Sequence, residues 1–270
     1  IYGIMTETSI GKLLIAGFVP GMLSTAMFML SVIIRSIRNP QIAPPVYGIT
    51  WAQRFSSIKG VWGIAAIGII VMGGIYTGVC TPTEAGALGA FGVIVLSFFT
   101  KRINRKALKE ALIDTTYSSG TIFVIAVGAM LIVPFFTVTK APQHISQFIV
   151  GLNISPILVV LTLGLVFVVL GMFVDALSLM LITLPVIFPT IVALGFDRIW
   201  FGVIMVKFVE LALITPPVGM NLYVIKGIAE DFSMTDIFKG VIWFVIADIC
   251  TLTILILFPQ ITLFLPNMMR

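Results

Sequence analysis

A short segment around Asp175 carries the residue types that bind a small hard cation. Gly171, Asp175 and Ser178 together offer backbone carbonyls, a carboxylate and a hydroxyl, and such oxygen ligands suit a hard cation. Asp175 lies in a long apolar stretch, where a charged side chain costs at least about 2.5–3.5 kcal/mol on insertion scales. The segment is therefore a candidate Na⁺ site. The alternative is that Asp175 only caps a helix.

A second such segment is the sequence Thr-Pro-Pro-Val-Gly at 215–219. Pro216 and Pro217 lack a backbone donor and block helix continuity, so carbonyl groups near them lose their helical partners. Thr215 adds a hydroxyl, Gly219 ends the break, and Asn221 adds an amide. The break and the Asp175 segment together could form an Na⁺ cage with few charges. The alternative is that the prolines only kink a helix.

The composition requires a membrane around these segments. The chain has 270 residues, of which 59% are hydrophobic and 10% are charged, whereas soluble domains average about 25% charged residues. Each apolar run is continuous, which favours helices of about 20 residues over the alternating strands of a barrel. The net charge of +5 does not indicate nucleic acid, because the basic residues cluster at 35–59 and 101–109, between apolar runs, as the positive-inside rule predicts.

The pattern predicts an all-α, polytopic membrane protein with six parts. A weak internal similarity, of 1–4 to 222–225 and of 9–14 to 233–238, suggests an inverted repeat. The parts are a tail of the first repeat (1–38), an amphipathic interfacial connector (39–60), scaffold-type helices of the second repeat (61–140), a re-entrant helical hairpin (141–196), a discontinuous helix (197–230) and a last transmembrane helix (231–270, spanning 237–265). The hairpin tip falls near 171–178. Irregular backbone at membrane depth is tolerated where it lines a wet cavity, which is typical of secondary transporters.

Other charged residues in apolar runs need an account. Lys207 and Glu210 are three residues apart and can pair on one helix, and Asp248 is expected to face a neighbouring helix. The role of Glu84 does not follow from its surroundings. The sequence lacks the usual hydrolase and phosphate-binding motifs, and its single histidine, His144, lies in an expected loop. The chain is therefore not expected to be an enzyme, although a membrane-embedded aspartyl hydrolase using Asp175 is an alternative.

Several motifs resemble the large membrane subunit of tripartite ATP-independent periplasmic (TRAP) transporters. They are Ser-Ile-Gly-Lys-Leu-Leu-Ile-Ala-Gly-Phe-Val-Pro-Gly at 9–21, Tyr-Thr-Gly-Val-Cys-Thr-Pro-Thr-Glu-Ala-Gly-Ala at 76–87, Gly-Met-Phe-Val-Asp at 171–175, Leu-Pro-Val-Ile-Phe-Pro at 184–189 and Glu-Leu-Ala-Leu-Ile-Thr-Pro-Pro-Val-Gly at 210–219. The resemblance implies an elevator-type, Na⁺-coupled symporter in a bacterial inner membrane. Its partners would be a small membrane subunit and a periplasmic substrate-binding protein, and its substrates organic anions such as C4-dicarboxylates or sialic acids.

The resemblance also assigns residues to these roles. Na⁺ binding falls on Gly171, Asp175, Ser178, Thr215, Pro217, Gly219 and Asn221, and substrate binding on Asp175, Thr215 and Pro216. The family's large subunit is normally longer, with a first half that carries an inner hairpin, so half of the substrate site and one Na⁺ site are expected outside this sequence. A divalent-anion sodium symporter working without a binding protein has the same architecture and is the nearest alternative. A non-transporting fragment is another.

Overall fold

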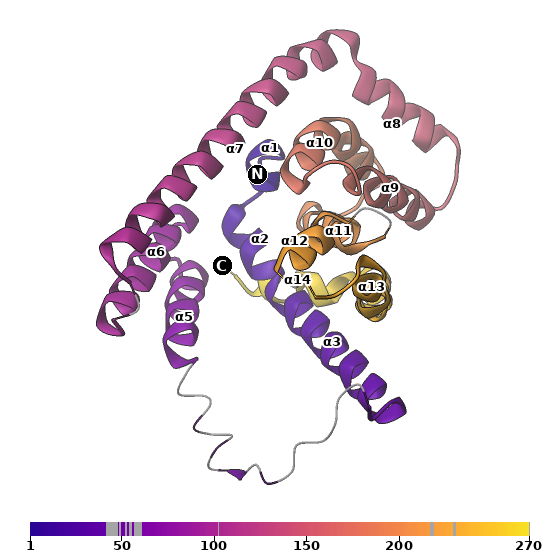
Figure 1. Ribbon diagram of the computed structural model, residues 1–270. Coiled ribbons are helices and arrows are strands. Elements are labelled where there is room, and N and C mark those ends of the chain that lie inside the picture. The colour runs from indigo at the N-terminus through magenta and orange to yellow at the C-terminus, as the bar shows by residue number, and fades with distance from the viewer. Residues whose placement is uncertain are drawn as a thin grey trace. The chain divides into compact units, whose positions relative to one another are not determined.

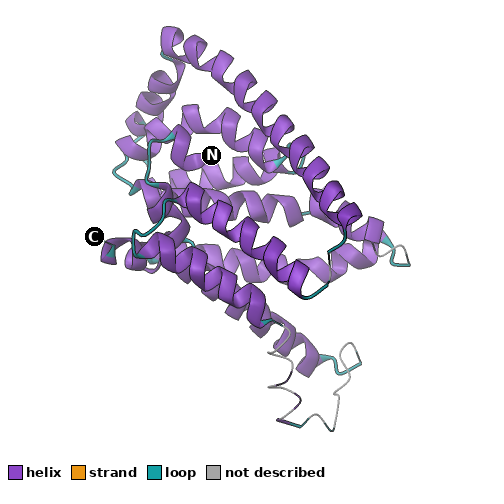
Figure 2. Ribbon diagram, turned by 90° about the vertical axis from the view of Figure 1, so that its left-hand side faces the viewer, coloured by secondary structure: helices purple, strands orange, loops and turns teal. Residues whose placement is uncertain are grey.

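The computed structural model describes residues 1–41, 48, 50, 51, 53, 56, 61–101, 103–216, 219–228 and 231–269, and most of these are in helices. No strand occurs among them (Figure 2). The interfacial connector predicted over 39–60 lies largely outside this range.

Thirteen helices are described. They are α1 (Tyr2–Met5), α2 (Ile10–Ala16), α3 (Phe18–Arg38), α5 (Trp62–Tyr76), α6 (Pro82–Phe99), α7 (Arg105–Thr139), α8 (Ala141–Gly151), α9 (Pro156–Gly171), α10 (Ala176–Ala193), α11 (Arg198–Ile214), α12 (Met220–Ile228), α13 (Met234–Leu257) and α14 (Pro259–Met268).

Five helical segments in the described part are long and apolar enough to cross a bilayer. They are Ile10–Arg38, which runs through α2 and α3, and Pro82–Phe99, Arg105–Thr139, Ala176–Ala193 and Met234–Leu257. Helices α5 and α9 are apolar but shorter. About 20 residues are needed for a perpendicular crossing of the hydrocarbon core. The expectation of an all-α, multi-pass membrane protein is therefore confirmed.

The chain divides into two compact units, residues 1–34 with 122–270 and residues 35–121. In the first unit α11 is the central helix and packs against α2, α9, α10, α12, α13 and α14 (Figure 1). The buried core of this unit draws on several of these helices, with Phe167 of α9, Leu184 of α10, Ile204 of α11 and Leu255 of α13 all almost fully enclosed. Both candidate ion-binding segments belong to this unit.

Three helices occupy the stretch predicted as a two-helix hairpin. The pair α9 and α10 has its turn at 172–175, where the tip was expected. Helix α8 precedes this pair and packs along α10. The chain leaves α8 through Asn153, which has a positive φ of 51°, and restarts at Ser155, whose hydroxyl caps α9, followed by Pro156 at its first position. Proline and a hydroxyl cap are typical helix starts.

The last predicted span, 237–265, is two helices rather than one. Helix α13 ends at Leu257 and α14 begins at Pro259, with Phe258 between them at φ −125° and ψ 73°. Proline disfavours the helical conformation of the residue before it and cannot donate to the preceding turn. Pro134, Pro185 and Pro189, by contrast, lie within continuous helices.

The second unit contains the antiparallel pair α5 and α6. Gly63 lies opposite Leu96 and Gly92 lies opposite Ile67, so the two helices run in opposite directions. Helix α6 begins with a capping box: Glu84 accepts hydrogen bonds from the Thr81 amide and hydroxyl, both at 2.8 Å, while Thr81 Oγ1 accepts from the Glu84 amide at 3.3 Å. The Thr-Pro-Thr-Glu sequence carries this signature. The structural role of Glu84 is therefore to start α6.

Replacing Glu84 by alanine is expected to fray the first turn of α6, because the Thr81 amide and hydroxyl lose their acceptor. Hydrogen exchange at the Thr81 and Glu84 amides should become several-fold faster. Glu84→Gln keeps an acceptor at this position and is the control. Equal exchange rates in wild type and Glu84→Ala would contradict the capping role.

Candidate functional site

The hairpin tip is organised by Asp175, the N-cap of α10. Its Oδ1 accepts hydrogen bonds from the amides of Leu177 and Ser178, both at 3.0 Å. The cap is favourable because the first amides of a helix have no helical partner. Gly171 is buried at the end of α9, and Asp175 and Ser178 are partly exposed. The capping interpretation of Asp175 is confirmed, and because both capping bonds go to Oδ1, it leaves room for a second role.

The break between α11 and α12 lies where the two prolines predict it. Helix α11 ends at Ile214, and Thr215 is extended, with φ −86° and ψ 127°. The Thr215 hydroxyl donates to the carbonyl of Leu211, so it is tied to its own helix. Gly219 has a φ of +47°, a left-handed conformation that favours glycine, and α12 begins at the next residue. Pro217 lies outside the described residues.

Two glycines bring the tip and the end of α11 together. Gly164 and Gly171 are seven residues apart on α9, which is about two helical turns, and both face α11. A Cβ at Gly164 would lie 2.1 Å from the ring of Phe208, and a Cβ at Gly171 would lie 2.7 Å from Cβ of Ala212. Ala212 is three residues before Thr215. The absence of two side chains on α9 thus allows the close packing that places the tip beside the break.

Gly164→Ala is expected to push α11 away from α9. The added methyl group would overlap the Phe208 ring, which is buried in the core of this unit. We expect the free energy of unfolding to fall by about 1–3 kcal/mol, as is usual for overpacking. Thermal unfolding of the purified protein measures this. Gly227→Ala on α12 is the control, because a Cβ there would meet nothing within 4 Å, and an equal loss in both variants would contradict the packing argument.

The remaining predicted residues lie beyond the break. Gly219 is buried, and a Cβ there would lie 3.1 Å from both Leu222 Cδ1 and the Thr215 carbonyl oxygen. Asn221 is on α12 and exposed, and Pro216 is partly exposed. The described contacts therefore join the tip, through Gly171, to the α11 side of the break, next to Thr215. They do not join it to Gly219 or Asn221.

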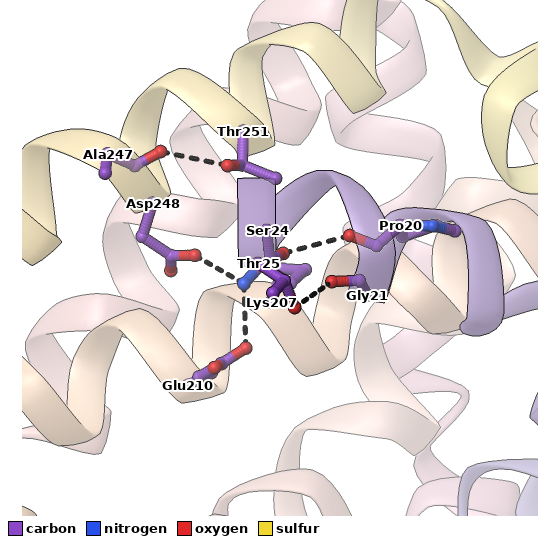
Figure 3. Close-up of polar contacts among 9 residues, drawn as sticks. All are labelled: Pro20, Gly21, Ser24, Thr25, Lys207, Glu210, Ala247, Asp248 and Thr251. Carbon is purple, nitrogen blue, oxygen red and sulfur yellow. Dashed lines mark hydrogen bonds and ion pairs between the residues drawn. The ribbon is translucent and has the colours of Figure 1, made fainter. Parts of the chain in front are cut away.

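A network of three charged residues joins α11 to α13 (Figure 3). Lys207 Nζ donates to Glu210 Oε2 at 2.8 Å and also to Asp248 Oδ1 on α13. The side chains of Lys207 and Asp248 are only 7% and 1% exposed, whereas that of Glu210 is 49% exposed. Glu210 borders a cavity of about 670 Å³, together with Ser24 and Thr25 of α3.

Residues 1–261 match the family described as "Tripartite ATP-independent periplasmic transporter, DctM component". The chain belongs to this family. The matched range includes the tip, the break and the charged network.

Individual relatives agree with this assignment. The C4-dicarboxylate TRAP transporter large permease protein DctM of Pseudomonas aeruginosa is 33% identical over 99% of this chain and 62% of its own length. The ectoine TRAP transporter large permease protein TeaC of Halomonas elongata is 31% identical over 99% and 62%. The sialic acid TRAP transporter permease protein SiaT of Haemophilus influenzae is 30% identical over 100% and 43%. The chain thus spans less than two thirds of the length of these relatives, which are permeases and not enzymes.

The geometry of the TRAP permease chain also speaks against the hydrolase alternative. An aspartyl hydrolase needs two facing carboxylates, but Asp175 caps α10 and Asp248 is paired with Lys207. The pairing of Lys207 with Glu210 was predicted from their spacing and is confirmed. The part of Asp248 in this network was not predicted in detail, although a lone aspartate and a lysine in two apolar helices are the signal that could have suggested it.

Proposed function

We propose that this chain is part of the large permease of a Na⁺-coupled TRAP transporter that imports an organic anion across a bacterial inner membrane. A periplasmic binding protein delivers the substrate, and a small membrane subunit completes the complex. The observation that supports the proposal most strongly is the family match over residues 1–261, combined with the packing of a hairpin tip against an interrupted helix. Transporters built from discontinuous helices place their ion and substrate sites at such breaks.

The ion site that we propose uses the oxygen donors of the tip and the break. At the tip they are the Gly171 carbonyl, the Asp175 carboxylate and the Ser178 hydroxyl. At the break they are the Thr215 hydroxyl and carbonyl, with Pro217, Gly219 and Asn221 completing the set. The contact between Gly171 and Ala212 supports a shared site. Ala212 lies in the last turn of α11, so this contact brings the tip next to Thr215, the first residue after the helix. Hard oxygen ligands of this kind suit a small cation.

The substrate that we propose is an organic anion held near Asp175, Thr215 and Pro216. Named relatives transport C4-dicarboxylates and sialic acid. A carboxylate beside Asp175 would be repelled unless a cation lay between them. Bound Na⁺ therefore makes substrate binding favourable, which is the electrostatic basis for coupling the two. Movement of the hairpin-bearing helices as one body, an elevator mechanism, is supported by the tight glycine-mediated packing of α9 on α11.

The test is uptake into proteoliposomes. The complete gene product that carries this chain is reconstituted with its small subunit and binding protein, and uptake of C4-dicarboxylates and sialic acid is measured under an inward Na⁺ gradient or a K⁺ gradient. We expect uptake that requires both Na⁺ and the binding protein. Uptake with Na⁺ but without the binding protein would favour the simpler divalent-anion symporter. Uptake that is equal in Na⁺ and K⁺ would contradict Na⁺ coupling.

A further inference from the structure

The ion pair between Lys207 and Asp248 connects two helices that are distant in sequence. Lys207 on α11 and Asp248 on α13 are 41 residues apart, and both are almost fully buried (Figure 3). Glu210, three residues after Lys207, already gives the ammonium group a partner on its own helix. The second partner on α13 satisfies a further donor of this nearly buried ammonium group. It also adds a specific attachment of α11 to α13.

On its α9 side, α11 is held by the close contacts at Gly164 and Gly171, and on its α13 side it is held by apolar packing and by side-chain hydrogen bonds. Smooth apolar helix surfaces tolerate small shifts, whereas a buried polar pair is satisfied at one register only, and fixing register is the best-attested use of such pairs. Two side-chain hydrogen bonds link α11 to α13. Lys207 donates to Asp248, and Trp200 Nε1 donates to the carbonyl of Leu255, near the end of α13, at 3.0 Å. Of the two, the ion pair lies nearer the break.

The register of α11 decides where the break is placed. Thr215 is eight residues after Lys207, or about 12 Å along a continuous helix. A slip of one residue would move Thr215 by about 1.5 Å and turn it by about 100°. Helix α11 ends just before Thr215, so the position of Thr215 follows directly from the register of this helix. Binding sites need their ligands held to within about 0.5 Å.

We infer that Lys207 is a positioning residue, whose pairing with Asp248 fixes the register of α11 and thereby sets the affinity of the cation site between the tip and the break. The inference rests on the proposed Na⁺ coupling. Lys207 does not touch the ion. It acts through the helix that ends at Thr215, while Gly164 and Gly171 hold the opposite side of the same helix against α9.

The deciding variant replaces both charges at once, Lys207→Met with Asp248→Leu, in the complete gene product. Replacing a buried ion pair by apolar side chains of similar volume is often neutral or stabilising, so the protein should fold while the register contact is lost. The readout is the unfolding temperature as a function of Na⁺ concentration, with K⁺ as the reference, since a ligand that binds the folded state raises this temperature.

In the absence of Na⁺, we expect the unfolding temperature of the double variant to be within a few degrees of that of the wild type. Its half-saturating Na⁺ concentration should be about 10- to 100-fold higher, as for other groups that orient metal ligands. Glu210→Gln is the matched control. It removes an ion pair within α11 and should leave half-saturating Na⁺ unchanged. A stable double variant with wild-type Na⁺ affinity would overturn the inference and leave Na⁺ coupling standing.

A second variant covers the case in which the double variant does not fold. Asp248→Glu keeps the ion pair but lengthens it by one methylene, so half-saturating Na⁺ should rise, by less than in the double variant. The unfolding temperature should fall by several degrees, because the added methylene overpacks an enclosed site. Unchanged Na⁺ affinity in Asp248→Glu would overturn the inference. Absence of any Na⁺ effect on the wild type would instead overturn the proposed Na⁺ coupling, and the inference with it.

Discussion

Lys207→Met alone is expected to lower the free energy of unfolding by about 3–5 kcal/mol, the usual cost of removing one partner from a buried ion pair. Methionine fills the space of the lysine but donates no hydrogen bond. Asp248 is 0% exposed, and its Oδ2 already lacks a partner among the described residues. The variant would leave the whole carboxylate enclosed without a donor. Denaturant or thermal unfolding in detergent micelles measures the loss.

Two other variants test whether the lost stability comes from the unpaired Asp248 carboxylate or only from lost packing around residue 207. Glu210→Gln removes a half-exposed ion pair, which is worth about 1 kcal/mol or less because solvent screens it. Adding Asp248→Leu to Lys207→Met removes the stranded carboxylate and should restore most of the lost stability. If Lys207→Met were as stable as the wild type, or the second substitution restored nothing, the ion pair would not be the source of the effect.

Two backbone interruptions of this protein follow from local rules. The prolines after Thr215 end α11, and the segment from Gly171 to Asp175 forms the turn between α9 and α10, as their residue types predict. Two further interruptions, at Asn153 and at Phe258, were not predicted. Pro259 follows an unbroken apolar run and interrupts the helix there. Pro185 and Pro189 also lie in an apolar run, but α10 continues through both of them. Packing against neighbouring helices, which the local sequence does not contain, decides between them.

The pairing of residues across the fold was harder to predict than the residues themselves. The spacing of Lys207 and Glu210 predicts their contact, because both are on one helix. A lone aspartate in an apolar helix suggests that Asp248 has a charged partner, but the sequence does not identify Lys207 as that partner, since the contact depends on how α13 packs on α11. The seven-residue spacing of Gly164 and Gly171 likewise indicates a close helix contact. It does not say that Phe208 and Ala212 of α11 fill the space.

Asp175→Asn is expected to have the largest effect on ion binding. Asparagine caps a helix about as well as aspartate, so the bonds to the Leu177 and Ser178 amides should persist and the tip should keep its shape. The charge is lost, however. At 4 Å and an effective dielectric constant of about 20, its attraction for a monovalent cation is about 4 kcal/mol, so half-saturating Na⁺ should rise by two to three orders of magnitude. Na⁺-dependent uptake and Na⁺-dependent unfolding temperature both measure this.

Asp197 provides a matched control for this substitution. It caps α11 with the same geometry, its Oδ1 accepting from the amides of Ile199 at 2.8 Å and Trp200 at 2.9 Å, but it lies at the other end of that helix from the break. Asp197→Asn should therefore leave Na⁺ affinity unchanged. Asp175→Ala removes the cap as well as the charge and should cost a further 1 kcal/mol or so of stability. If Asp175→Asn bound Na⁺ as the wild type does while Asp175→Ala lost stability, Asp175 would be a cap alone, and the ion site would have to rest on the hydroxyl and carbonyl groups at Ser178 and Thr215.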